Sequence, residues 1–532
     1  MRCPGLLAAV YAAWGLLYVW RTSFLLDGQR VFVLWDDAMI SMRYAQNLVA
    51  GDGLVWSPGE RVQGISNLGV TLVLAALHGL PVGEWRVSLL FQLVNLGLLL
   101  GILALAHRLA RELTPGELLV PLLASAAVAL YAPLSIWSLQ GSDVGPVAAV
   151  VFGSLLASAR RLRERRGPSR TAWALLSLGV LLRLDVAVVF LGFISFAALQ
   201  GRRAWRSAAE GSALLAASLG AVLAFGMLYY GDPLPNTFYL KATGAPIADV
   251  LANGGRQIWG MLTPLSPVLL AVALLGGWLL RRDPLVPLAA LCVLALFLYD
   301  LGVGGDWLKA HHSRFLVPAV ALYCVLHVVA ARAVLARWLP APRLTSPAGR
   351  LALAGLSLLG AFAFYSPVAT REWLWPVEPT LWWQKNRANA RMALYLREQT
   401  PLGTSVALHA AGTTGYFVRR PTLDVLGKSD RHIARLPVRF FHPGHSKWDW
   451  DYILLERRPD VIVDMSRGLE GHSELARSYF LARTPGGLQF HVRRDRVAGL
   501  RDHALVFYAF RSRKGLDWQA AVALAAAEGQ AP

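Results

Sequence analysis

The sequence predicts a polytopic α-helical membrane protein that ends in an α/β domain. Of its 532 residues, 55% are hydrophobic and only 16% are charged, whereas roughly 25% of the residues of an ordinary soluble protein are charged. The mean hydropathy of +0.45 requires many apolar segments close to the roughly 20 residues with which a helix crosses a bilayer. These observations exclude a single soluble globular domain.

The first apolar segment, residues 5–26, predicts a retained membrane anchor, because it is longer than the apolar core of a signal peptide and lacks a clean A-x-A exit. Ten further apolar segments follow, so we expect about eleven transmembrane helices in all. These ten segments are residues 88–106, 118–135, 144–159, 171–183, 186–199, 207–229, 258–280, 284–300, 314–337 and 350–367.

The arginines of the loops predict the topology. Six arginines lie within residues 160–170 alone, and clusters of this kind mark cytoplasmic loops under the positive-inside rule. The other basic loops are residues 202–206, 281–282 and 332–350. All of these loops fall on one side only if the short apolar segment 68–80 does not cross, so we predict that it is an interfacial helix in a long first outer loop, residues 27–87. The net charge of +19 is then a membrane signature and does not indicate nucleic acid.

The same parity places the N-terminus in the cytoplasm and the chain after residue 367 outside it. We expect residues 1–367 to form the transmembrane catalytic domain and residues 368–532 an extracytoplasmic domain. This second part alternates helix-like segments, such as residues 389–398, with strand-like segments, such as residues 405–409, which indicates a small α/β domain.

The polar residues that packing explains least lie in the predicted outer loops. Asp36 and Asp37 begin a helical pattern directly after the first span, where they could simply cap the helix. Four other outer loops also carry charged or hydrogen-bonding groups. They are residues 140–143, 183–185, 229–241, and 304–307 followed by Lys309, His311, His312 and Arg314. Five such loops facing one leaflet favour a site for an anionic group at the lipid surface.

Several of these segments carry a family resemblance. Asp36-Asp37-Ala38 with Arg43-Tyr44-Ala45, followed by residues 51–64, resembles the first-loop signature of GT-C membrane glycosyltransferases. The chain is most similar to actinobacterial terminal β-(1→2) arabinofuranosyltransferases and their bacterial relatives. The matching segments further along the chain are residues 230–241, 304–307, 424–427, 432–435 and 443–447.

The resemblance implies transfer of a sugar, D-arabinofuranose in the nearest relatives, from a polyprenyl-phosphate donor to a glycan acceptor outside a bacterial cytoplasmic (inner) membrane. A carboxylate can act as general base or nucleophile and stabilise positive charge on the sugar, and cations can neutralise the departing phosphate. We assign the catalytic role to Asp36 and Asp37. The predicted donor site consists of Arg43, Tyr44, Asp143, Arg183, Asp185, Asn236, Tyr239, Lys241, Asp306, His312 and Arg314. The predicted acceptor site consists of His409, His445 and Lys447.

Several alternatives stay open at this stage. Residues 141–144 and 183–185 depart from the relatives' Gly-x-Glu-Thr and Arg-Pro-Asp patterns, which leaves the donor sugar open, a hexose included. No metal ligands are assigned, although carboxylates such as Asp36, Asp37 and Asp143 could hold a divalent cation (Mg, Mn or Ca). A lipid-phosphate transporter or flippase is the rival class of function, but the inverted repeat typical of transporters is not found.

Overall fold

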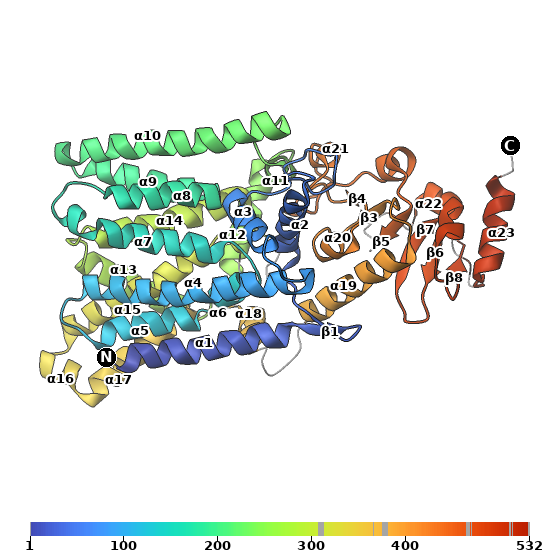
Figure 1. The fold of residues 1–532 in the computed structure, drawn as a ribbon. Helices are drawn as coiled ribbons and strands as arrows, with labels where there is room; N and C mark the ends of the chain where they lie inside the picture. The colour runs from blue at the N-terminus through green and yellow to red at the C-terminus, as the bar shows by residue number, and fades with distance from the viewer. Residues whose placement is uncertain are drawn as a thin grey trace.

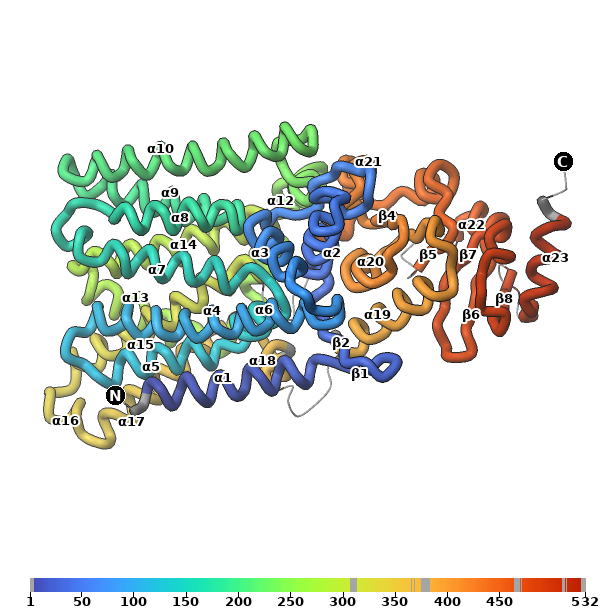
Figure 2. Tube along the Cα trace, in the orientation of Figure 1, coloured from blue at the N-terminus to red at the C-terminus, as the bar shows by residue number. Residues whose placement is uncertain are grey.

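The protein consists of a helical bundle with a smaller sheet domain at one end. The computed structural model describes residues 2–306, 313–364, 366–374, 381–463, 469, 471–509, 512 and 514–529. The bundle helices lie side by side, and the N-terminus and the C-terminus lie at opposite ends of the molecule (Figure 1, Figure 2). The predicted fold class, a polytopic helical protein with a C-terminal α/β domain, is confirmed.

Every predicted apolar segment overlaps a helix of the bundle. These helices are α1 Arg2–Thr22, α4 Glu84–Leu113, α5 Leu119–Leu130, α6 Ala132–Leu139, α7 Val144–Arg163, α8 Arg170–Leu182, α9 Val186–Leu199, α10 Arg202–Phe225, α13 Ser266–Leu279, α14 Leu285–Val303, α15 Val317–Trp338 and α17 Pro347–Leu359. Within the described chain, four helices are long and apolar enough to cross a membrane unaided: α4, α10 with its extension to Tyr230, α14 and α15. A fifth span results if α5 and α6, which are bent by 57° at their junction, are counted together.

One of the predicted spans, residues 258–280, is interrupted in the structure. Residues 258–280 do not form one helix, because α12 (Ile247–Gly260) ends before α13 begins at Ser266. Pro264 and Pro267 explain the interruption, since proline has no backbone N–H and favours the first turn of a new helix over a helix interior.

The basic loops gather at the end of the bundle away from the sheet domain (Figure 1). Arg163 forms ion pairs with Glu112 and Asp283, and Arg332 pairs with Glu117. These pairs join four segments that are far apart in sequence: the connection between α4 and α5, the end of α7, the connection between α13 and α14, and helix α15. The arrangement agrees with the inference that the arginines share one side of the membrane; which side that is stays a prediction.

Two short helices occupy the junction between the bundle and the sheet domain. Helix α2 spans Asp36–Ala50 and α3 spans Leu68–His78, and the two helices pack against each other. Helix α3 is apolar but has only 11 residues, too few for a crossing. It also contacts α4 and α8, as expected of a helix at the bundle's outer edge.

The sheet domain, called the outer domain below because the predicted topology places it outside the cytoplasm, contains a six-stranded mixed sheet. Its strands are β3 Val406–Leu408, β4 Thr422–Asp424, β5 Val461–Val463, β6 Tyr479–Arg483, β7 Gln489–Arg493 and β8 Val506–Tyr508, in the spatial order β4-β3-β5-β7-β6-β8. Strand β3 lies parallel to both β4 and β5, and the remaining pairs are antiparallel. Because parallel strands end at the same edge of a sheet, the loops after β3 and β4 lie next to each other. Both loops contact α2.

Candidate active site

A cavity of about 360 Å³ lies where the outer ends of the bundle helices meet the sheet domain. Its lining combines charged side chains with an apolar wall. The charged residues are Asp37, Asp143, Arg183, Lys241, Arg314 and Lys428, and the apolar wall includes Leu184, Phe238, Ile247, Val250, Val303 and Phe315. The cavity therefore brings together five residues that the sequence analysis assigned to catalysis or donor binding.

Asp37 is held between two cations. Its Oδ1 lies 2.5 Å from Lys428 Nζ, and its Oδ2 lies 2.8 Å from Arg314 Nη1. Trp35 is the N-cap of helix α2, and no side chain caps this helix end, although both aspartates lie in the first turn, where the helix dipole favours carboxylates. Helix capping does not explain the two contacts of Asp37 with cations. Burial alone would raise the pKa of Asp37, but Lys428 and Arg314 hold it well below its usual value.

Arg314 is itself fixed by a second carboxylate. Its Nε lies 2.7 Å from Asp306 Oδ2, and Asp306 is almost fully buried. Gln257 of α12 accepts a hydrogen bond from the backbone N–H of Asp306 and donates one to its carbonyl. The preceding Gly305 has φ of +75°, and a Cβ there would lie 2.4 Å from the Gln257 side-chain oxygen, so glycine is required for this close approach.

A separate ion-paired group lies on another wall of the cavity. Arg183 Nη1 lies 2.9 Å from Asp143 Oδ1, and its other terminal nitrogen pairs with Asp185. Only 7% of the Arg183 side chain is exposed. Since both neighbours are carboxylates, the guanidinium charge of Arg183 is already compensated.

Lys241 is the exception among the cavity cations. It belongs to α11 (Asn236–Ala242), and within the described part of the chain its ammonium forms no ion pair and no hydrogen bond. Gly444 of the outer domain lies over the Lys241 side chain: a Cβ placed on Gly444 would lie 3.3 Å from Lys241 Cε. Burial lowers the pKa of Lys241, and the nearby Arg314 charge adds to this effect.

Asp36 faces the outer domain. Its Oδ1 accepts a hydrogen bond from the backbone N–H of Thr413 at 3.1 Å, at the start of helix α20 (Thr413–Val418), which follows β3. Burial raises the pKa of Asp36, although Lys428 opposes the shift. The two adjacent aspartates therefore differ: Asp37 lines the cavity and stays ionised, whereas Asp36 joins the two domains.

Lys428 is the functional residue that the sequence analysis missed. It follows β4 in a turn in which the Asp424 carboxylate accepts hydrogen bonds from the backbone N–H groups of Leu426 and Ser429, at 3.0 and 2.7 Å. Attraction to Asp37 outweighs burial and raises the pKa of Lys428. Its position directly after the family-like segment 424–427 was the available signal.

Two predicted donor-site residues of α2 have structural roles instead. Arg43 is buried, and its guanidinium donates to the carbonyls of Trp56, Gly415 and Arg420. Tyr44 is fully buried, and its hydroxyl donates to the Val62 carbonyl. Neither residue lines the cavity, and these groups hold the outer loop against the sheet domain, so the structure does not support their predicted role in donor binding.

The same correction applies to three residues at the α11 contact. The Asn236 amide donates to the carbonyls of Gly427 and Asp430, and the Tyr239 ring lies under the Arg435 guanidinium, 4.4 Å away. Neither Asn236 nor Tyr239 lines the cavity. Lys447 is fully buried and donates to the carbonyls of Tyr239 and Ala434, so it cannot bind an acceptor as predicted.

The remaining predicted acceptor residues are close to each other. The rings of His409 and His445 have centroids 6.5 Å apart, and the charges of Lys428 and Asp37 act on His445. Burial lowers the pKa of His445 to about 3, so its ring is neutral near pH 7. The predicted donor-site residue His312 lies outside the described residues.

Comparisons with known proteins identify the fold. A family described only as a domain of unknown function (DUF8728) matches residues 379–508. Among curated proteins nothing matches. ArnT from Cupriavidus metallidurans is similar in structure both in the apo state and bound to undecaprenyl phosphate, with TM-scores of 0.53 and 0.54, 14% identity, and coverage of 91% of this chain and 97% of ArnT. The apo oligosaccharyltransferase of Archaeoglobus fulgidus has a TM-score of 0.53 and 12% identity, and the match covers 92% of this chain and 74% of that one.

The chain has the GT-C fold.

The side chains of the cavity do not fit a divalent cation. Both oxygens of Asp37 are paired with cations, and Asp143 is paired with Arg183. Throughout the described ranges, no three His, Cys, Asp or Glu side chains gather in a way that could hold a metal ion.

Proposed function

We propose that the protein is a membrane glycosyltransferase that moves a sugar, D-arabinofuranose, from a polyprenyl-phosphate donor to an extracytoplasmic glycan acceptor. One observation carries the proposal: an ionised carboxylate, Asp37, shares a cavity with Lys241, Arg314 and Lys428 at the outer edge of a GT-C bundle. A glycosyl transfer from a lipid phosphate needs this combination of charges.

The cations match the leaving group. As the bond from the sugar to the phosphate breaks, negative charge grows on the phosphate oxygens, and preorganised ammonium and guanidinium groups stabilise it. Lys241 is the best placed to contact the phosphate, because no described carboxylate pairs with it. Arg314 and Lys428 already share Asp37, so they would contribute both to the phosphate and to the position of the carboxylate.

The low pKa of Asp37 decides its assigned role. A carboxylate held between two cations is a weak base, but it remains negatively charged while the anomeric carbon gains positive charge. We therefore assign Asp37 to stabilising the sugar in the transition state or attacking it directly, and we assign Asp36 to joining the domains.

The lipid chain of the donor has an apolar route to this cavity. Ile247 and Phe238 line the cavity while 67% and 43% of their surfaces are exposed. Helix α12 continues this exposed apolar surface with Trp259, which is 77% exposed. The similar ArnT structure bound to undecaprenyl phosphate supports a polyprenyl-phosphate ligand.

The choice of arabinofuranose rests on the sequence motifs, since fold similarity does not fix a substrate. A panel of polyprenyl-phosphate sugars, arabinofuranosyl and hexosyl, should be incubated with the purified protein and a glycan acceptor. Mass spectrometry then measures released polyprenyl phosphate and glycosylated acceptor. We expect turnover with the arabinofuranosyl donor, and turnover with a hexosyl donor alone would replace the sugar while keeping the reaction class.

Asp37→Asn is the matched inactive control in this assay. If no donor is consumed and the protein instead moves a fluorescent lipid phosphate across proteoliposome membranes equally well with or without Asp37, the transporter class replaces the glycosyltransferase.

A further inference from the structure

A second cavity, of about 460 Å³, lies in the outer domain, away from the site described above. It is bounded by helix α19 (Leu381–Gln399), by the hairpin of β1 (Phe24–Leu26) and β2 (Gln29–Val31), and by the turn between β6 and β7. Its size falls in the range of about 300 to 1,000 Å³ that is typical of small-molecule sites. The candidate active site shares no lining residue with it.

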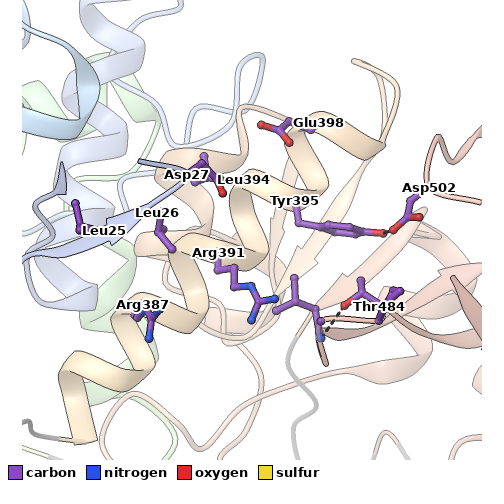
Figure 3. Close-up of a pocket in the computed structure, with 13 residues that line it drawn as sticks. Leu25, Leu26, Asp27, Arg387, Arg391, Leu394, Tyr395, Glu398, Thr484 and Asp502 are labelled. Carbon is purple, nitrogen blue, oxygen red and sulfur yellow. Dashed lines mark hydrogen bonds between the residues drawn. The ribbon is translucent and has the colours of Figure 1, made fainter. Parts of the chain in front are cut away.

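Two arginines of this cavity have uncompensated charges. Arg387 and Arg391 lie one turn apart on α19, and both side chains line the cavity (Figure 3). Over the ranges described, neither guanidinium forms an ion pair, although Arg397 on the same helix pairs with Glu84 at 2.6 Å. Like charges at this spacing destabilise a helix. The Arg387 guanidinium lies over the Trp383 ring, 5.6 Å from its centre, but no described carboxylate compensates the charge of either arginine.

The turn opposite Arg391 is shaped to receive its guanidinium. A Cβ on Gly486 would lie only 2.3 Å from Arg391 Nη2, so the arginine occupies the space that any other residue's side chain would fill. The next residue, Gly487, has φ of +83°, a conformation that glycine adopts without strain. The turn therefore lets the Arg391 guanidinium lie directly against the backbone.

Carboxylates and apolar groups line the rest of the cavity. Asp27 at the hairpin tip and Glu398 on α19 form no side-chain ion pair with any described residue and lie on the side away from the arginines (Figure 3). Leu25, Leu26 and Leu488 provide an apolar surface between them. Asp502 is a third carboxylate of the lining, and it accepts a hydrogen bond from the Tyr395 hydroxyl (Figure 3). Arginine donors, carboxylate acceptors and apolar side chains together suit a sugar chain, whose hydroxyls both donate and accept and whose ring faces are apolar. A simple anion would be repelled by the three carboxylates.

We propose that this cavity is a glycan-binding subsite that holds sugars of the acceptor at a distance from its reacting end. The inference rests on the proposed function and makes the acceptor an oligosaccharide or polysaccharide. Helix α19 connects the two sites, because Asn386, next to Arg387, donates to the carbonyl of Leu34 at 3.3 Å, two residues before Asp36. An acceptor that binds to α19 would therefore be held by the helix that contacts the segment leading to Asp36 and Asp37.

The direct test is binding without turnover. The full-length protein in lipid nanodiscs, carrying Asp37→Asn, is applied to an array of immobilised bacterial envelope oligosaccharides of two to twelve sugars. We expect binding to the longer glycans and a loss of about tenfold or more in the double variant Arg387→Ala/Arg391→Ala. Gly486→Val, which displaces the Arg391 guanidinium without removing its charge, should give a similar loss. Arg477→Ala on α22 (Ser473–Ser478), whose side chain is 80% exposed, is the matched control and should bind normally.

Kinetics with the active protein provide the second measurement. The double arginine variant should raise the KM for long acceptors and leave both the KM for the donor and the kcat with short acceptors unchanged. Equal glycan binding by the double variant and its parent, or no binding by the parent to any glycan, overturns the subsite. Glycan binding by a protein that consumes no polyprenyl-phosphate sugar would instead support the subsite and refute the proposed function.

Discussion

At the scale of single residues, the site depends on which charges are compensated. Asp37 is flanked by Lys428 and Arg314, and Arg183 by two carboxylates, whereas Lys241 forms no ion pair with any described residue. Its ammonium lies 6.0 Å from the centre of the Phe315 ring, and the charges of Asp306 and Asp37 act on it without direct pairing. In a partly buried cavity an uncompensated ammonium attracts an anion more strongly than it would in water. Under the proposed function, we therefore expect the donor phosphate to bind next to Lys241.

Lys428 should control both the position and the charge of Asp37. Lys428→Met removes a contact of 2.5 Å, and we expect kcat to fall by about 10-fold to 100-fold. The pKa of Asp37 should rise because one of the cations that hold it down is gone. The measurement is the pH profile of kcat, in which the acid limb should move to higher pH. Lys428→Arg keeps the charge and should restore most of the activity, whereas an unchanged profile in Lys428→Met would mean that the lysine has only a structural role.

Lys241 should produce a loss of donor affinity at alkaline pH. Burial lowers its pKa, so the ammonium loses its proton, and with it the attraction to phosphate, at a lower pH than an exposed lysine would. We expect kcat/KM for the donor to be constant at lower pH and to fall as pH rises through this lowered pKa. Lys241→Arg keeps its charge throughout and should shift the alkaline limb upward. An identical limb in both proteins would assign the titration to another group.

At the scale of elements, the segments that follow two parallel strands, β3 and β4, connect the outer domain to helix α2. The loop after β3 donates to Asp36, and the turn after β4 presents Lys428 to Asp37. The first two residues of α2, Asp36 and Asp37, are thus held by the two segments that follow β3 and β4 at the same edge of the sheet. The turn after β4 is the more constrained, since Gly427 has φ of +79° and a Cβ there would lie 2.8 Å from Ile433 Cγ2.

Gly427→Ala should therefore affect stability and activity together. The left-handed backbone conformation and the close contact should destabilise the outer domain by about 1 to 3 kcal/mol, and the displaced turn should move Lys428 away from Asp37. Thermal unfolding and turnover measure the two effects. Gly403→Ala, in the same domain, has open space around its Cβ and no positive φ, so it should change neither. Full activity in Gly427→Ala would show that the turn can shift without moving Lys428.

At the scale of the whole molecule, the bundle separates the arginine-rich loops from the cavity. The arginine-rich loops lie at one end, and the cavity and sheet domain lie at the other (Figure 1). The positive-inside rule predicts that the cavity end is extracytoplasmic. This orientation would place the donor sugar on the same side of the membrane as an envelope glycan.

Cysteine labelling tests this orientation. Ser473→Cys in the outer domain and Arg202→Cys at the other end of the bundle are both exposed positions, and Cys292 and Cys324 are buried, which limits the background. In cells whose outer barrier has been removed, an impermeant maleimide should label Ser473→Cys and leave Arg202→Cys unlabelled. The opposite pattern would invert the topology and place the cavity in the cytoplasm.

The sequence by itself determined the helical bundle, the α/β tail and the acidic pair. Apolar segments near the length of a membrane crossing, arginine clusters and the segment Asp36-Asp37 are all local patterns, so they can be recognised without knowing the fold. Local patterns also led to Arg183, Lys241 and Arg314, because each lies in a polar break between apolar segments.

Only the tertiary structure decided which of these groups remain available. Arg43 and Lys447 are cations like Lys241, but they donate hydrogen bonds to backbone carbonyls of distant segments. Lys428 enters the cavity because strands β3 and β4 are parallel and end beside α2, a contact that joins residues almost 400 positions apart. Whether a charge is compensated depends on partners that are remote in sequence, and those partners are fixed only when the outer domain packs on the bundle.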